Sequence, residues 1–113
     1  MSEPTILLTG FEPYGGRGLN PSHEVMQRLD GRAIAGARIR GRSFPVALKP
    51  LSGLIADALR ETAPVAVLSL GLWPGEAMLR LERVGLNLAD FEIADNDGAV
   101  LLDAPIEGNG PAA

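Results

Sequence analysis

An almost wholly apolar run near the middle of the chain places the strongest limit on its fold. Val65–Leu70 contains one hydroxyl side chain and no charge, and it lies between Pro64 and Gly71, which mark its two ends. Such a run is typical of a central parallel strand that is covered on both faces. We therefore expect a layered structure in which helices pack on a buried sheet.

Two further strands and two helices are predicted before this run. Thr5–Thr9 and Ala37–Ser43 have strand-like composition. Asn20 is a suitable N-cap for a helix whose first position is Pro21 and which ends at Asp30-Gly31. A second helix has apolar side chains at the spacing of one helical face, namely Leu51, Leu54, Ile55, Ala58 and Leu59. This alternating order predicts an α/β fold with a parallel sheet at its centre.

The pattern changes after the apolar run. Residues 78–91 and 92–106 are predicted as longer extended segments, with Asp95-Asn96-Asp97-Gly98 as a turn. Only two convincing helices are present, too few to cover both faces of a parallel sheet. We expect residues 1–113 to form a single domain that is incomplete at its C-terminal end. The chain is then either a fragment or a domain whose exposed side is covered by a partner.

Composition excludes several classes of protein. The chain has 113 residues, 46% of them apolar and 21% charged, which is typical of a soluble globular domain. We expect no transmembrane helix and no signal peptide, and hence a cytoplasmic protein. With no cysteine, the chain has no disulfide, thiolate metal site or thiol nucleophile. Its single histidine, His23, leaves little scope for a metal cluster, so no metal site is predicted.

Charge is distributed unevenly and does not favour nucleic acid. Residues 1–60 have a net charge of +3 and residues 61–113 a net charge of −7. Arg38, Arg40 and Arg42 would share one face of a strand. Trp73 and Tyr14, the side chains that could stack on bases, lie far from them in the sequence. We interpret this stripe as a solvated face.

Two loops are candidate ligand sites because each follows a predicted parallel strand, where α/β proteins bind ligands. Phe11 and Tyr14 lie three residues apart on the first loop, and their rings could hold a small flat ligand or pack into the core. Gly71 and Leu72 begin the loop after the apolar run, whose backbone N–H groups could bind a carbonyl or an oxyanion.

A charged residue on a predicted strand is the candidate catalytic group. Apolar alternation in Leu79–Leu88 changes phase at Glu82-Arg83, which predicts a bulge. The bulge would turn Glu82 into a cleft. The alternative is an exposed carboxylate that is ion-paired with Arg80 and Arg83.

Several motifs together resemble those of the pyroglutamyl peptidase I (pyrrolidone-carboxylate peptidase) family. They occur in the family's order as TGFEPYGG, Asn20-Pro21-Ser22, LERVGLN, Asp95-Asn96-x-Gly98 and GPAA. The resemblance implies a three-layer α/β/α fold and a cytoplasmic thiol protease that removes N-terminal pyroglutamate from peptides. It implies no metal or nucleotide cofactor, and it implies oligomers.

The same resemblance assigns site residues. Glu82 matches the family's catalytic glutamate, Phe11 and Tyr14 match the aromatic positions of its lactam-ring pocket, and Gly71 and Leu72 match the adjacent loop. The family's Cys and His lie beyond Ala113, so we expect this chain alone to be inactive. The alternatives are a non-catalytic domain that binds a lactam or acyl ligand, and a half-protein that needs a C-terminal partner.

Some positions depart from the family pattern. Glu76 and Glu92 stand where arginines are expected, and Arg80 replaces a small polar residue. Replacing arginine by glutamate would turn an anion contact into repulsion. We therefore expect altered peptide specificity or a loss of activity.

Overall fold

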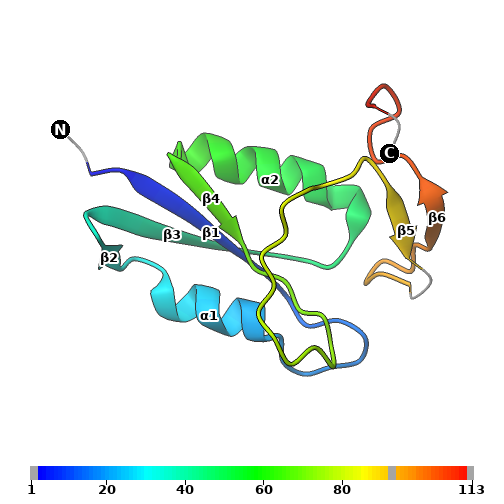
Figure 1. The fold of residues 1–113 in the computed structure, drawn as a ribbon, viewed down its shortest axis with the longest axis horizontal. Coiled ribbons are helices and arrows are strands. Elements are labelled where there is room, and N and C mark those ends of the chain that lie inside the picture. The colour runs from blue at the N-terminus through cyan, green and yellow to red at the C-terminus, as the bar shows by residue number, and fades with distance from the viewer. Residues whose placement is uncertain (1–2, 92–93, 112–113) are drawn as a thin grey trace.

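The computed structural model describes residues 3–91 and 94–111. Two sheets and two helices follow each other along the chain (Figure 1), in the order β1 (Thr5–Phe11), α1 (Pro21–Leu29), β2 (Ala33–Ile34), β3 (Ala37–Phe44), α2 (Leu48–Thr62), β4 (Ala66–Ser69), β5 (Ala89–Phe91) and β6 (Leu101–Ala104).

The main sheet has four strands in the order β2-β3-β1-β4. Strand β1 pairs in parallel with β3 on one side and with β4 on the other, and β2 adds an antiparallel edge. The predicted parallel sheet is thus confirmed, as are the strands and helices expected before the apolar run.

The two helices lie on opposite faces of this sheet, which makes three layers (Figure 1). Leu7 and Leu8 are adjacent on β1 and point to opposite faces. Leu7 packs with Phe44 and Ala58, on the side of α2. Leu8 packs with Met26 and Ile39, on the side of α1. The core therefore consists of two thin apolar clusters separated by β1, and the three-layer α/β/α arrangement is confirmed.

A glycine allows α1 to lie directly on the sheet. A Cβ atom at Gly10 would be 2.4 Å from the carbonyl oxygen of Ser22, in the first turn of α1. No real Cβ tolerates that distance, so any other residue would push the helix away. The contact fixes the start of α1 beside the end of β1.

The apolar run Val65–Leu70 is not the covered central strand that its composition predicts. It contains β4, which lies at the edge of the sheet, and all four residues of β4 are exposed. Strand β1 is the central one instead. Both helices pack over β1 and β3, so among the described residues nothing covers β4 on its free side.

The longer extended segments expected after the apolar run are mostly absent. Residues 78–88 contain no strand, and β5 and β6 form a short antiparallel pair with a register shift between Ala89 and Phe91. An alternating sequence forms a strand only where neighbouring backbone groups accept its hydrogen bonds. Residues 78–88 have no such neighbour among the described residues, and Leu79 and Leu81 are exposed.

Candidate functional site

Two loops meet where the strand order reverses, between β1 and β4. Strands β3, β1 and β4 have the order 2-1-3 of doubly wound folds, in which ligands bind at the carboxyl ends of the strands beside this point. The loop after β1 and the loop after β4 both leave the sheet there. The Tyr14 hydroxyl donates a hydrogen bond of 2.7 Å to the Leu72 carbonyl oxygen and joins the two loops.

A pocket of about 560 Å³ lies between these loops and the start of α2. This volume suits a small organic ligand. The pocket contains four residues that the sequence predicted as ligand-binding, Phe11, Tyr14, Gly71 and Leu72. The other lining residues are Asn20, Val46, Ala47, Leu48, Leu51, Trp73, Asp90, Ala94 and Asp95.

The Phe11 ring contacts both the core and the pocket. It meets the ring of Phe44 edge to face, with centroids 6.5 Å apart and planes at 68°. It also packs on the core cluster formed by Leu7 and Ala58. The sequence left open whether this ring packs into the core or holds a ligand, and the geometry allows both, because one part of the ring is anchored while another lines the pocket.

Asn20 is a lining residue that sequence reasoning assigned only to helix capping. Its side chain is 1% exposed and accepts hydrogen bonds from the Ser22 N–H (3.0 Å) and the Ser22 hydroxyl (2.7 Å), which confirms the N-cap. Its amide also donates to the Glu12 carbonyl oxygen at 3.1 Å. Asn20 therefore fastens the first loop to α1. The capping signal was visible in the sequence, but the contact with Glu12 was not.

The turn Asp95-Asn96-Asp97-Gly98 forms the third wall of the pocket. Asp95 Oδ2 accepts a hydrogen bond of 2.9 Å from the Leu48 N–H, so it caps α2 from a distant part of the chain. Asn96 donates from its backbone N–H to the Val46 carbonyl (2.7 Å) and from its side chain to the Pro13 carbonyl (3.1 Å). The turn was predicted correctly, but its place in the site depends on these long-range contacts.

Backbone donors hold the Asp95 carboxylate in its charged form. The N–H groups of Leu48, Ala99 and Asp97 all donate to it. Together they lower the pKa of Asp95 below its ordinary value of 3.8, and Leu48 has the largest effect. The wall of the pocket is therefore negatively charged near neutral pH.

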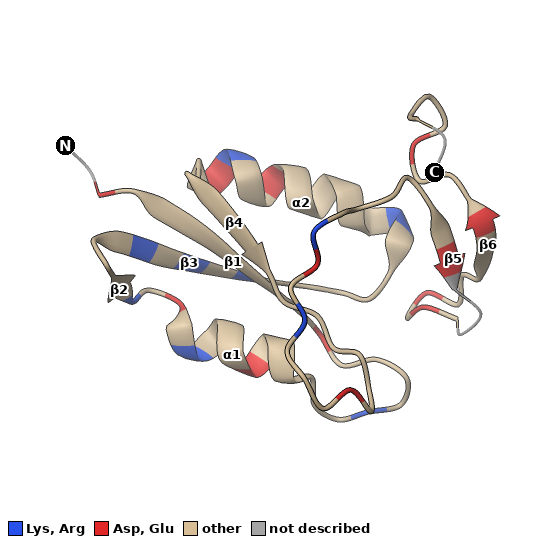
Figure 2. Cartoon of the chain, in the orientation of Figure 1, with Lys and Arg blue, Asp and Glu red and all other residues tan. Residues whose placement is uncertain are grey.

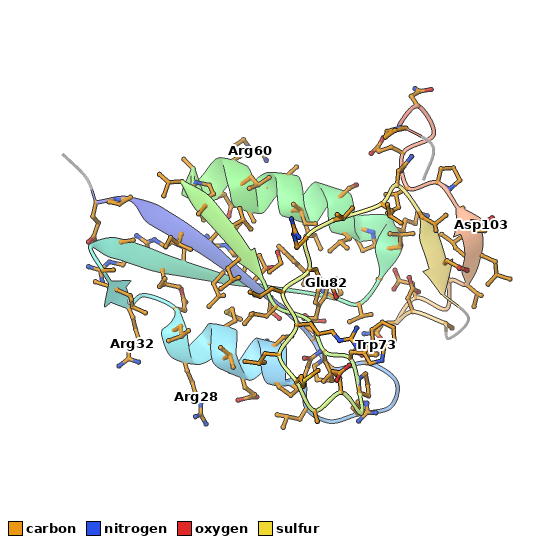
Figure 3. All side chains as sticks on the ribbon, in the orientation of Figure 1. Arg28, Arg32, Arg60, Trp73, Glu82 and Asp103 are labelled. Carbon is orange, nitrogen blue, oxygen red and sulfur yellow. The ribbon has the colours of Figure 1, made fainter. Side chains whose placement is uncertain are left out.

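Glu82 does not line this pocket. It is exposed, and it lies in the irregular segment 78–88 that leads from the β4 loop to β5 (Figure 3). The predicted strand and its bulge at Glu82-Arg83 do not form. Within residues 3–91 and 94–111 Glu82 has no ion pair, so the alternative of pairing with Arg80 and Arg83 is wrong as well. The catalytic role of Glu82 stays a prediction.

Two of the positions that depart from the family pattern contact each other. Arg80 Nη2 lies 2.7 Å from Glu76 Oε2, and Glu76 is the more buried partner. The Glu76 carboxylate therefore has a basic partner four residues further along the chain. Glu92 lies outside the described residues.

The described residues contain no group of three or more His, Cys, Asp or Glu side chains that could hold a metal ion. His23 lies on α1, with its Nδ1 atom 2.8 Å from the Ser43 hydroxyl oxygen, and it is not a lining residue of the pocket. No helix within the described ranges is long and apolar enough to cross a membrane.

The fold and the pocket define an α/β protein with a small, largely apolar pocket at the carboxyl ends of its parallel strands. The family model for pyroglutamyl peptidase matches residues 4–113, and the chain belongs to this family of hydrolases. The predicted resemblance is therefore confirmed.

Known proteins of this family match the chain along nearly its whole length. The pyrrolidone-carboxylate peptidase of Chromobacterium violaceum is 44% identical over 113 residues, covering 96% of this chain and 52% of that protein. The Escherichia fergusonii enzyme is 38% identical over 109 residues. The solved structure of pyrrolidone carboxyl peptidase from Pyrococcus furiosus matches with a TM-score of 0.91 at 35% identity, covering 96% of this chain and 52% of that one. The chain spans about half the length of the curated relatives that it matches.

Proposed function

We propose that this chain forms the lactam-ring pocket of a pyroglutamyl peptidase and holds the N-terminal pyroglutamyl group of a peptide there. A pyroglutamyl ring is small, flat and uncharged, with apolar faces and one amide edge. The observation that carries the proposal is the pocket itself, which is built from Phe11, Tyr14, Gly71 and Leu72 between two loops joined by the Tyr14–Leu72 hydrogen bond.

The chemistry of the walls supports this ligand. Phe11, Leu51 and Leu72 offer apolar surface to the faces of the ring, and the backbone of the β4 loop offers polar groups to its amide edge. Pockets of this type use few polar groups to orient a ligand and use apolar walls for affinity. The peptide that follows the ring leaves through the open side of the pocket.

Cleavage of the pyroglutamyl bond needs groups that this chain does not contain. A thiol peptidase attacks the carbonyl carbon with a thiolate, while a histidine takes up the proton and later gives it to the leaving amine. The chain has no cysteine, and its single histidine is bonded to Ser43 away from the pocket. We infer that the chain binds the ring and that hydrolysis depends on a Cys and a His supplied from elsewhere.

The experiment combines a binding assay with an activity assay. Adding 2-pyrrolidone or pyroglutamyl amide to the isotope-labelled chain should shift the NMR signals of Phe11, Tyr14 and Leu72. The same chain should release nothing from a fluorogenic pyroglutamyl amide. Absence of binding by the folded chain would contradict the pocket assignment, and turnover by the chain alone would contradict the need for an added Cys and His.

A non-catalytic lactam- or acyl-binding domain is the second candidate, because the chain has the apolar pocket but no cysteine. Adding the unmatched C-terminal segment of the Chromobacterium violaceum relative distinguishes the two. Turnover that requires both polypeptides supports the proposal that this chain is one half of a peptidase. If a stable mixture of both polypeptides still binds the ligand but shows no turnover, the result supports a non-catalytic binding domain.

A further inference from the structure

We propose that Trp73 selects the residue that follows the pyroglutamyl ring and favours peptides in which that residue is a lysine or an arginine. The inference rests on the proposed function, because it places the ring in the pocket, and it adds a class of substrate to that function. Trp73 lines the pocket next to Leu72 and is 80% exposed. It lies beside the loops that meet there (Figure 3). Most of its indole is therefore available to a ligand.

The indole is carried by a turn that has little conformational freedom. The Glu76 N–H donates a hydrogen bond of 3.2 Å to the Trp73 carbonyl oxygen, which closes a β-turn. Its central residues are Pro74 and Gly75, and a proline followed by a glycine with a φ of 85° is typical of a type II turn. The preceding carbonyl, that of Leu72, also accepts a hydrogen bond. A residue held in this way loses little entropy when it contacts a ligand.

The spacing of the two chains places the indole next to the second residue of a bound peptide. In the proposed complex Leu72 lies against the ring, and the Cα atom of Trp73 follows about 3.8 Å further along. The second residue of the peptide follows the ring directly as well. A pocket of about 560 Å³ suits a ligand larger than a single five-membered ring, so it has room for this side chain.

The charge of the walls decides which side chain fits beside the indole. Asp90 and Asp95 line the pocket, and the lining residues include no Lys or Arg. Arg80, the first basic residue after Trp73 in the sequence, pairs with Glu76 at 2.7 Å. A basic side chain is attracted to the carboxylates and to the face of a tryptophan, the aromatic side chain that binds cations best. An apolar side chain packs on the indole without this attraction, and an acidic one is repelled.

Pyroglutamyl dipeptide amides that differ only in their second residue test the proposal. Trp73 is the single tryptophan of the chain, so its fluorescence reports binding at this position. The lysine amide should bind about fivefold more tightly than the norleucine amide, which has an aliphatic side chain without the charge. This difference should shrink at high salt. The glutamate amide should bind more weakly than either.

Variants show whether the indole makes this choice. Trp73→Leu keeps an apolar side chain and removes the aromatic face, so the ratio of lysine to norleucine affinity, measured by NMR titration, should fall at least twofold. Trp73→Phe keeps an aromatic face and should retain more of the ratio. The matched control is Leu79→Ala, because Leu79 is fully exposed and does not line the pocket, and it should leave the ratio unchanged.

Equal binding of the lysine and norleucine amides, or an unchanged ratio in Trp73→Leu, would overturn the proposal. If the chain still binds 2-pyrrolidone in either case, only the role of Trp73 is contradicted and the proposed function stands. A chain that is folded by circular dichroism and binds none of these ligands contradicts the proposed function and this inference together.

Discussion

Tyr14 contributes to the pocket through its hydroxyl group as well as its ring. The hydroxyl donates to the Leu72 carbonyl and holds together two loops that are 58 residues apart in the sequence. Replacing Tyr14 by phenylalanine keeps the ring and removes this hydrogen bond. Such a bond contributes about 1 kcal/mol, so we expect affinity for pyroglutamyl amide to fall about fivefold. NMR titration measures this, and unchanged affinity with an unchanged melting temperature would show that the hydroxyl does not position the loops.

Asp95 makes the stability of the fold depend on pH. Its pKa is lowered in the folded chain, chiefly by the Leu48 N–H. The charged form therefore stabilises the fold above the unfolded pKa near 4, and this stabilisation is lost as the pH falls through the lower folded pKa. We expect the thermal midpoint to fall on acidification from pH 5 to pH 3, and Asp95→Asn to reduce that fall. Asp97→Asn is the control from the same turn, and an equal effect of both variants would contradict the role of Asp95.

The sequence identified four of the thirteen residues that line the pocket, and the reason lies in the range of the contacts. Phe11, Tyr14, Gly71 and Leu72 directly follow predicted strands, so their place at one end of the sheet could be inferred. Asp95 is held at the site by a hydrogen bond from the N–H of Leu48, 47 positions earlier, which no local pattern reveals. At Glu82 a local pattern predicted a strand that does not form. A shift in apolar alternation indicates a bulged strand, but a strand forms only where a neighbouring strand pairs with it.

At the scale of elements, α1 depends on a single buried cap. Asn20 accepts from Ser22 and donates to Glu12, and all of these groups would lose a partner in Asn20→Ala. Loss of an N-cap costs about 1 kcal/mol, and unpaired buried groups add to this. We expect a loss of about 2 kcal/mol in the free energy of unfolding, measured with urea. Asn20→Ser, which keeps a capping oxygen on an uncharged side chain, should cost less, and equal losses would contradict the capping role.

The elements that the sequence predicts well are those stabilised locally or at the centre of the sheet. Helix α2 has an apolar face at regular spacing, and α1 has its cap and Pro21 in place. The apolar run after α2 identified a strand but not its position in the sheet. Composition does not fix the position of a strand in its sheet, and among the described residues β4 pairs with β1 alone.

At the scale of the whole molecule, the main sheet and the β5–β6 pair differ in the charge of their side chains. In Figure 2 basic residues lie along β3, helix α2 carries residues of both signs, and the β5–β6 region carries acidic ones. Asp90 and Asp95 bring this negative charge to the pocket, and the lining residues include no Lys or Arg. The net charge of the chain is −4.

This distribution predicts a preference between two related ligands. Neutral pyroglutamyl amide should bind more tightly than the pyroglutamate anion, by about fourfold, since two like charges 5 Å apart in water repel by roughly 0.8 kcal/mol. NMR titrations at low and high salt measure the difference, which should shrink as salt screens the charges. Tighter binding of the anion would show that the wall is not electrostatically negative.

The hydrogen bond from Leu48 to Asp95 also sets an order of events during folding. When α2 emerges from the ribosome, the residue that caps its first turn has not been made, since it lies 47 positions further along the chain. Closing so long a loop costs entropy that must be offset before the contact forms. Strands β1, β3 and β4 can pair earlier, and the third wall of the pocket closes afterwards. Ligand binding is therefore a readout of the last stage of folding, and a nascent chain that ends before Asp95 would have the sheet without a finished pocket.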